Sequence, residues 1–302
     1  MIIKGVTDLM TETRNQKTMT IGTKNGFEIA RLINNEDQDV AKAVSAEIEC
    51  IGDAIERAAD KFKDGGRLIY IGAGTSGRLG ALDAIELTPT YGVPAERAFG
   101  ILAGGAEAMY SAVEGAEDSK ELAVNDLMEV TLTSKDVLIG IAASGRTPYT
   151  ISALEYGDRV GAFTIALTCN PQSQMAKVAD ISIAPLVGPE VITGSTRMKA
   201  GTAQKMVLNS LSTGIMIKSG YVYENLMINV QPTNEKLVAR SIGIIEQILG
   251  TDEATATEIF ENANRNIAVG LVMVKKHLSR LQATELLASK NFNINEIEGI
   301  VD

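Results

Sequence analysis

Five short apolar runs in the first two thirds of the chain are continuous rather than alternating. They are RLIYIG, RAFGILAGG, DVLIGIAAS, AFTIALTC and ISIAPL, and each ends in a loop rich in Gly, Ser, Thr or Pro. A helical pattern follows most of them. Continuous apolar strands that alternate with helices are typical of parallel sheets covered on both faces. The pattern predicts an α/β fold with a doubly wound parallel sheet of about five strands.

Helical patterns surround these runs. From residue 37 to residue 62, apolar side chains recur every three or four positions, which predicts one amphipathic helix. The stretch MKAGTAQKMVLNSLSTGIMIKSG predicts a second, largely buried helix. Beyond VQPTNEKL four short helical patterns follow, with Gly250, Asp252 and Ser279 as stops and caps. We therefore expect an N-terminal arm (1–35), extended and packed on the rest of the chain, then an α/β domain (36–235) and a small helical C-terminal domain (236–302).

Composition narrows the class of protein. A chain of 302 residues with 45% hydrophobic residues can bury one large core, or one core and a small additional domain. A net charge of −10, with scattered Lys and Arg, argues against nucleic acid or an anionic membrane as the main partner. No apolar run could span a bilayer, and MIIKGVTDLM lacks the core of a signal peptide, so a cytoplasmic location is expected.

Cysteine and histidine are too scarce to support a disulfide framework, a His-rich metal site or a Ser-His-Asp triad. Cys50 and Cys169 form neither a disulfide framework nor a metal-ligand spacing, and we expect both thiols to be buried. His277 is the single histidine, which removes most support for a Ser-His-Asp triad or a His-rich metal site. Acid and base catalysis is therefore expected from carboxylates.

Two loops repeat one short motif. YIGAGTSGR (70–78) and GIAASGRTP (140–148) each place Ser-Gly-Arg after a predicted strand and before a predicted helix. Helix N-termini with hydroxyl side chains suit a phosphate, so the hydroxyls of these loops are candidate ligands: Thr75, Ser76, Ser144 and Thr147. The alternative is that these hydroxyls only cap their helices.

The glycine spacing in the first loop also fits a dinucleotide site. Such a site needs a carboxylate at the end of the second strand to bind the ribose. Here that strand ends in Ile-Leu-Ala-Gly-Gly (101–105), without a carboxylate. The loop is therefore expected to bind a ligand smaller than NAD.

A third polar cluster and several carboxylates are further candidates for ligand binding or catalysis. GPEVITGSTRMKAGTAQK (188–205) places hydroxyls and cations at the start of a helix, which favours either a polar ligand or ordinary capping and solvated charges. Glu86 follows the first loop by one helical segment. Glu114, Glu117 and Asp118 lie where Gly115 breaks a helical pattern. Taken alone, each acid fits a helix cap or a solvated charge better than a catalytic role.

Several stretches together carry a resemblance to a known family. They are YIGAGTSGRLGALDA, YGVPAERAFGILAGG, AVEGAEDS, GIAASGRTPY, GPEVITGSTRMKAGTAQK and TNEKL, and their order and spacing resemble those of the bacterial N-acetylmuramic acid 6-phosphate etherases along nearly the whole chain. The resemblance implies a sugar isomerase (SIS) domain with flavodoxin-like strand order, followed by a small helical domain. It also implies a homodimer with sites completed across the interface, and no cofactor.

The resemblance assigns a reaction and its residues. It implies cleavage of the D-lactyl ether of N-acetylmuramic acid 6-phosphate by elimination and hydration, in recovery of cell-wall amino sugar. Glu86 then matches the acid that protonates the departing lactate, and Glu117 matches the base at carbon 2. By the same resemblance the 6-phosphate ligands are Thr75, Ser76, Ser144 and Thr147, and the further ligand contacts are Ser195, Thr196 and Arg197.

Departures from the family pattern leave alternatives open. Ile85 replaces a serine beside Glu86, and Thr88 departs from the proline pair that usually follows it. Both bear on fine substrate preference. An aldose–ketose phosphosugar isomerase would share proton abstraction beside a carbonyl but not elimination. A non-catalytic phosphosugar sensor would need neither glutamate.

Overall fold

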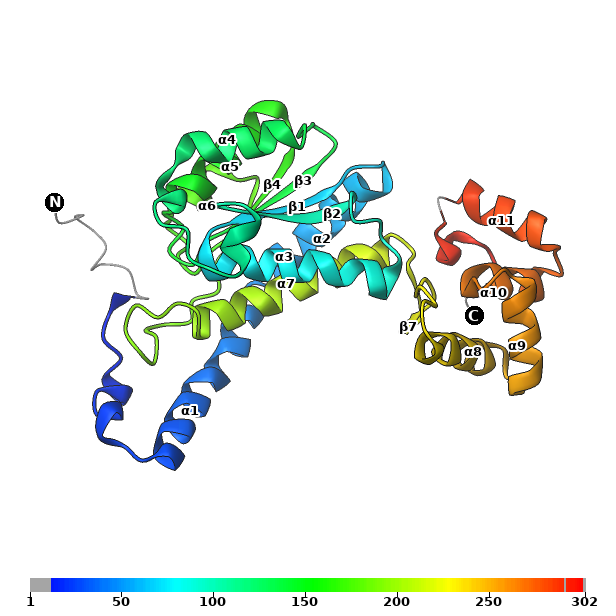
Figure 1. Cartoon of the computed structure of the whole chain (residues 1–302), viewed down its shortest axis with the longest axis horizontal. Helices are drawn as coiled ribbons and strands as arrows, with labels where there is room; N and C mark the ends of the chain where they lie inside the picture. The colour runs from blue at the N-terminus through cyan, green and yellow to red at the C-terminus, as the bar shows by residue number, and fades with distance from the viewer. Residues whose placement is uncertain (1–11, 291, 301–302) are drawn as a thin grey trace. The chain divides into compact units, whose positions relative to one another are not determined.

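The computed structural model describes residues 12–290 and 292–300 (Figure 1). Contacts divide the chain into two compact units. The first holds the described residues up to Ala84 together with Glu96–Ser212, and the second holds Ile85–Ala95 and the described residues from Thr213 onward. The expected domain limits at residues 35 and 235 stay a prediction.

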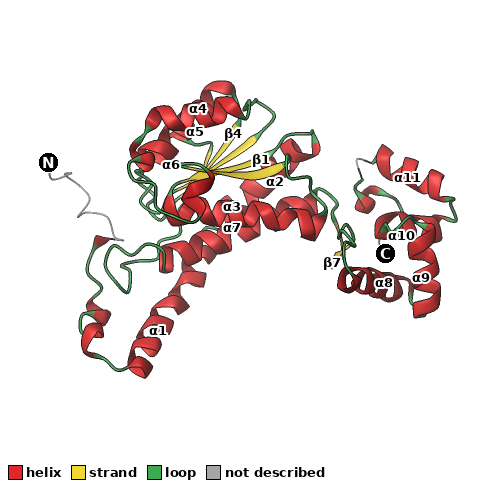
Figure 2. Ribbon diagram, in the orientation of Figure 1, coloured by secondary structure: helices red, strands yellow, loops and turns green. Residues whose placement is uncertain are grey.

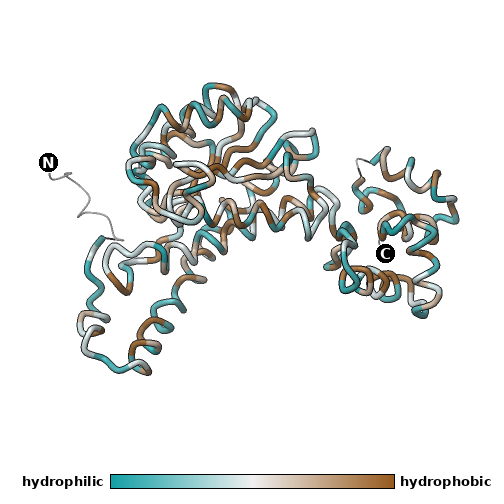
Figure 3. Tube along the Cα trace, viewed as in Figure 1, coloured by the Kyte–Doolittle hydropathy of each residue, from teal (hydrophilic) through white to brown (hydrophobic). Residues whose placement is uncertain are grey.

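A parallel sheet of five strands forms the centre of the first unit. The strands are β1 (Leu68–Gly72), β2 (Ala98–Leu102), β3 (Val137–Ile141), β4 (Phe163–Leu167) and β5 (Ile181–Ile183). Their order is β2-β1-β3-β4-β5, with every neighbouring pair parallel. The strands β1, β3 and β4 are buried along their whole length and the middle of β2 is half-buried, and Figure 3 shows the strands mainly in brown. The predicted doubly wound sheet with flavodoxin-like order is confirmed.

Helices cover both faces of this sheet (Figure 2). They are α2 (Ile48–Lys63), α3 (Gly74–Tyr91), α4 (Lys120–Glu129), α5 (Pro148–Val160), α6 (Gln174–Val178) and α7 (Lys199–Lys218). On one face, α4 and α5 pack on Ile69, Ile71 and Leu138. On the other face, α3 approaches β1 and β3 through Gly80, where a Cβ would meet Tyr70 and Ile141. Burial on two faces explains why the strands are apolar throughout.

The helix expected from residue 37 to residue 62 is in fact two helices. α1 (Gly26–Ser45) begins inside the predicted arm and ends before a turn, and α2 starts at Ile48. The turn lets Glu47 accept a hydrogen bond from the backbone N–H of Ala184 at 3.0 Å, next to β5. Ile48, one of the recurring apolar residues of that pattern, is exposed. The start of α1 carries a capping box between Asn25 and Glu28, a local signal that the periodicity alone does not reveal.

The second unit is mainly helical. It contains α8 (Glu235–Leu249), α9 (Glu253–Asn262), α10 (Ile267–Lys276) and α11 (Arg280–Ser289). Gly250 ends α8 with φ of +65°, and Asp252 and Ser279 cap α9 and α11, as predicted. The hairpin of β6 (Val222–Tyr223) and β7 (Leu226–Met227) was not predicted.

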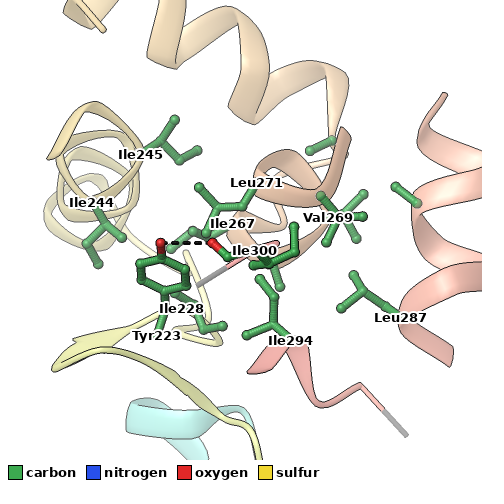
Figure 4. Packing of buried hydrophobic residues seen from close by; sticks show 14 of the residues in the cluster. Tyr223, Ile228, Ile244, Ile245, Ile267, Val269, Leu271, Leu287, Ile294 and Ile300 are labelled. Carbon is green, nitrogen blue, oxygen red and sulfur yellow. Dashed lines mark hydrogen bonds between the residues drawn. The ribbon is translucent and has the colours of Figure 1, made fainter. Parts of the chain in front are cut away.

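The second unit has its own apolar core. Side chains from all four helices and from the hairpin meet in it (Figure 4). The hydroxyl of Tyr223 donates to the carbonyl oxygen of Ile300 at 3.1 Å, which ties the hairpin to the last described residues. Among the described helices, none is both long and apolar enough to cross a membrane.

Candidate functional site

Two loops leave adjacent strands at the point where the winding of the sheet reverses. β1 lies between β2 and β3, and its last residue, Gly72, pairs in register with Ile141 at the end of β3. Ligands of open α/β sheets bind at the carboxyl ends of strands at such a switch point. The loop after β1 carries Thr75 and Ser76, and the loop after β3 carries Ser144 and Thr147. The two loops that share the Ser-Gly-Arg motif therefore follow adjacent central strands.

The first loop is short because α3 begins directly behind β1. Gly74 starts the helix with φ of +52°. A Cβ on Gly77 would lie 2.4 Å from the carbonyl oxygen of Gly72, so only glycine allows this turn to approach the strand so closely. Thr75 and Ser76 therefore lie in the first helical turn. The expectation that Ser-Gly-Arg precedes the helix is wrong for this loop.

The second loop has a different geometry. Gly145, with φ of +64°, lies against Ser173, where a Cβ would be 2.3 Å from the Cβ of that residue. Ser144 Oγ accepts a hydrogen bond from the backbone N–H of Arg146 at 3.2 Å. Thr147 is the N-cap residue of α5, yet its side chain makes no capping hydrogen bond. Capping therefore does not account for Thr147, whose hydroxyl remains a candidate ligand.

A pocket of about 300 Å³ opens beside the first loop. Ala73 and Gly74 form one wall, and Glu114 and Glu117 line another. Arg78, the cation among the lining residues, uses its guanidinium to donate to the carbonyl oxygens of residues 108, 109 and 111 at 2.9, 3.2 and 3.3 Å. Arg78 thus ties the segment before Glu114 to α3. The volume lies at the lower limit of typical small-ligand pockets.

The packing of Ala116 positions Glu117. Ala116 and Glu117 belong to a 3-10 turn (Ala116–Asp118) that follows Gly115, which has φ of +76°. Ala116 is buried in the same apolar cluster as Tyr149 at the start of α5. The turn is therefore fixed against the helix that carries the second loop. Both Glu114 and Glu117 are exposed, so their oxygens are accessible to a ligand in the pocket.

The start of α7 is already capped by a carboxylate. Glu190, fully buried, accepts the backbone N–H groups of Lys199 and Ala200, both at 2.9 Å. Burial raises the pKa of Glu190, although these hydrogen bonds act in the opposite direction. The N-terminal donors of α7 are therefore used within the protein. This arrangement weakens the case for an anion at the end of this helix.

Lys199 is a structural residue rather than a ligand contact. Its ammonium is buried and lies 3.1 Å from Glu36 Oε2 on α1. Glu36 also binds Lys17 at 3.0 Å and accepts from Asn15 at 2.7 Å. Burial alone would raise the pKa of Glu36, but the hydrogen bonds from Lys17, Asn15 and Lys199 lower it below its ordinary value. Nothing local in the sequence links these residues, so the network was not predicted.

Ser195, Thr196 and Arg197 lie in the segment that precedes α7. Ser195 and Thr196 are half-buried and Arg197 is exposed. The backbone oxygen of Thr196 accepts from Gly201 at 2.9 Å. A Cβ on Gly201 would lie 3.7 Å from Thr75 Cγ2, so the first turn of α7 packs beside the first loop. Contact of these three side chains with a ligand stays a prediction.

Glu86 lies on α3, and it is exposed. At a rise of about 1.5 Å per residue, it lies about 18 Å along the helix from Gly74. It does not line the pocket that contains Glu117. Its catalytic role stays a prediction.

Two further pockets lie within the second unit. The larger, about 520 Å³, is lined by Glu235, Glu246, Glu253 and Arg265 among others, and Arg265 is already paired with Glu261 at 3.0 Å. The acidic lining disfavours a phosphate ligand. Across the described ranges, no group of three or more His, Cys, Asp or Glu could hold a metal ion. Cys169 is buried as expected, whereas Cys50 is exposed because it lies at the solvent side of α2.

Two sequence families match the part of the chain that holds the sheet. The profile described as the glucokinase regulatory protein N-terminal SIS domain matches residues 50–158. The profile of the SIS domain matches residues 116–213. Together with the five-stranded sheet and the paired loops, these matches define a SIS-domain protein.

Curated relatives match nearly the entire chain. N-acetylmuramic acid 6-phosphate etherase 1 of Enterococcus faecalis is 60% identical over 289 residues, 96% of each chain. N-acetylmuramic acid 6-phosphate etherase of Lactobacillus johnsonii is 52% identical over 292 residues, 97% of this chain and 98% of that protein. The chain belongs to the N-acetylmuramic acid 6-phosphate etherase family. The solved structure of a phosphoheptose isomerase from Francisella tularensis is similar at 15% identity and a TM-score of 0.46, over 62% of this chain and 96% of that one.

Proposed function

We propose that the protein is a carbon–oxygen lyase that cleaves the D-lactyl ether of N-acetylmuramic acid 6-phosphate. The products are N-acetylglucosamine 6-phosphate and D-lactate. The observation that carries this proposal is the 60% identity, over 96% of the chain, to a relative named for that substrate. The pocket at the end of β1, with Glu117 in its wall, supports it.

The reaction requires one base and one acid. In the open-chain sugar the hydrogen on carbon 2 lies beside the aldehyde, so a carboxylate can remove it. The electron pair then expels the lactyl oxygen from carbon 3, and a protonated carboxyl group supplies the proton that lactate needs. Water adds to the resulting double bond and restores the hydroxyl at carbon 3. Glu117 is assigned the base and Glu86 the acid, two roles that environment can separate.

The phosphate is assigned to the two loops at the switch point. Hydroxyls of Thr75, Ser76, Ser144 and Thr147, with the N-terminal amides of α3, supply donors for a doubly charged phosphate without a lysine. Ser195, Thr196 and Arg197 are assigned further contacts on the side where α7 meets α3.

Glu86 is assigned to the site of a second copy of the chain. The helix rise puts Glu86 about 18 Å from the first loop on its own α3, farther than a monosaccharide phosphate can bridge. A homodimer with sites completed across its interface would remove this difficulty. We place the enzyme in the cytoplasm, in catabolism of cell-wall amino sugar, with no cofactor, no nucleic acid and no membrane as partners.

Release of D-lactate from N-acetylmuramic acid 6-phosphate by the purified protein tests the proposal. We expect stoichiometric D-lactate and N-acetylglucosamine 6-phosphate. Interconversion of aldose and ketose phosphates without lactate would identify an isomerase instead. Phosphosugar binding without turnover would identify a sensor, and either result would contradict the proposal.

A further inference from the structure

A series of polar contacts joins α3 to α7, which lie side by side (Figure 1). Ser76 Oγ donates to Gln204 Oε1 at 3.0 Å. Further along the same two helices, Asp83 accepts from Asn209 at 2.7 Å and from Ser212 at 3.2 Å. The contact between Ser76 and Gln204 involves a residue of the first loop.

The hydrogen bonding of Gln204 is incomplete. The residue is 1% exposed, and its Nε2 group has no acceptor within the described part of the chain. A buried amide donor without a partner is rare in proteins. The single hydroxyl proton of Ser76 points to Gln204 Oε1, so in this arrangement Ser76 cannot donate to a ligand.

We propose that Gln204 is a positioning residue for the phosphate site. When a phosphate group binds, its side-chain amide turns by a flip that exchanges the positions of Oε1 and Nε2. After the turn, Gln204 Nε2 donates to Ser76 Oγ, and Ser76 directs its own proton to a phosphate oxygen. The inference rests on the proposed function, because it takes Ser76 as a phosphate ligand.

The count of hydrogen bonds favours the turned state only when an anion is present. Without a ligand, Ser76 and Gln204 share one bond in either orientation of the amide. With a phosphate, the turned amide allows two bonds, and the bond from Ser76 is the stronger, charge-assisted kind. The group left without a partner changes from an N–H to a carbonyl oxygen, which proteins tolerate more often.

Two variants separate this role from simple packing. Gln204→Glu keeps the length of the side chain but can only accept when ionised, so it holds the Ser76 proton away from the phosphate. Ser212→Ala removes a buried contact of the same helix pair with Asp83, two turns further along α7, and serves as the structural control. Inorganic phosphate is the probe, with its dissociation constant measured by calorimetry on the full chain.

We expect Gln204→Glu to weaken phosphate binding by about tenfold or more, because a hydrogen bond to a charged group is lost. Ser212→Ala should leave phosphate affinity within about twofold of wild type while lowering the melting temperature. Equal phosphate affinity in wild type and Gln204→Glu, or absence of phosphate binding to wild type, would overturn the inference. These outcomes do not depend on lactate release, so failure of the proposed reaction is detected separately.

The pH dependence gives a second readout. When the introduced glutamate is protonated, its O–H group can donate to Ser76 Oγ as the amide does. The ratio of dissociation constants, variant over wild type, should therefore fall as pH is lowered from about 8 to about 5, the range in which buried carboxyl groups titrate. A ratio that stays constant over this range would contradict the proposed role, since a purely structural defect does not titrate.

Discussion

Carboxylates in this protein fall into two groups that differ in burial and in hydrogen bonding. Glu36, Glu190 and Asp83 are buried, and each accepts at least two hydrogen bonds from the protein. Glu114 and Glu117 are exposed at a pocket. The oxygens of the buried carboxylates are occupied by hydrogen bonds within the protein. The exposed carboxylates are accessible to a ligand in the pocket.

Substitution of the two assigned glutamates should separate the two halves of the reaction. Glu86→Gln should abolish D-lactate release, because the leaving oxygen is no longer protonated, while carbon 2 still exchanges its hydrogen with deuterated water. Glu117→Gln should abolish both. Losses of about 100-fold or more are expected for removal of a general acid or base. Proton NMR in deuterated water measures both events in one sample.

Glu114→Gln is the matched control, because Glu114 lines the same pocket as Glu117. We expect it to retain most of the exchange and of the lactate release. Loss of exchange in Glu114→Gln but not in Glu117→Gln would reassign the base. Exchange and release that fall together in Glu86→Gln would show that the assumed division of roles is wrong.

The buried pair of Glu36 and Lys199 makes stability depend on pH. Because the pKa of Glu36 is lowered in the folded state, its contribution is present above the unfolded value near 4.5 and is lost as pH falls through the folded pKa. Glu36→Gln leaves the buried ammonium of Lys199 without its counterion, which costs about 3 kcal/mol or more at neutral pH. Denaturant unfolding at several pH values measures this loss.

The difference in unfolding free energy between wild type and Glu36→Gln should shrink as the pH falls below the unfolded value near 4.5, and it should vanish below the lowered folded pKa, where the wild-type carboxylate is also neutral. Asp39→Asn is the control, since Asp39 forms an exposed pair with Lys42, and it should change stability little. A difference for Glu36→Gln that is constant from neutral to acid pH would contradict the assigned ion pair.

At the scale of elements, the approach of α3 to the end of β1 sets the position of the first loop. Gly77→Ala would place a methyl group 2.4 Å from the Gly72 carbonyl oxygen, so the first turn of α3 must move. We expect a loss of stability of about 1 to 3 kcal/mol, with weaker phosphate binding because Thr75 and Ser76 move with the turn. Denaturant unfolding and phosphate titration measure the two effects.

Gly52→Ala provides the matched control on α2. A Cβ there meets no atom within 4 Å, and alanine is the better helix former by about 1 kcal/mol. Stability should therefore rise or stay unchanged, with phosphate affinity as in wild type. Unchanged phosphate affinity in Gly77→Ala would mean that the turn of α3 does not position the ligand.

The five strands and the helical tail were predictable because their patterns are local. A continuous apolar run reports burial on both faces, and caps such as Asp252 and Ser279 report where helices begin. The break between α1 and α2 was not predictable from periodicity, because the apolar spacing continues through it. It depends on Glu47, which binds the backbone N–H of Ala184, far away in sequence.

The candidate site was predictable only in part, because some of its residues contact partners that are distant in the sequence. The loops after β1 and β3 were located from their composition, and the strand order brings them together. Lys199, one of the cations in the cluster at 188–205, binds Glu36, a partner 163 positions away. Gln204 gave no local signal either, since its contact with Ser76 arises from the packing of α7 on α3. The role of a residue whose partners lie far away in the sequence can be assigned only from the structure.

In the complete protein, the proposed reaction requires both glutamates to reach one substrate molecule. Glu117 lines the pocket of its own chain, whereas Glu86 lies about 18 Å along α3 from the start of that helix. We therefore propose that each site of a homodimer combines Glu117 of one protomer with Glu86 of the other. Such composite sites can be tested by mixing inactive variants.

The direct test is to mix Glu86→Gln protein with Glu117→Gln protein, after subunit exchange, and to measure D-lactate release. If sites are shared between protomers, every mixed dimer contains one intact site, and an equal mixture should recover about one quarter of wild-type activity. If both glutamates of a site came from one chain, every site in the mixture would lack one of them. An equal mixture that forms mixed dimers and stays inactive would contradict the account.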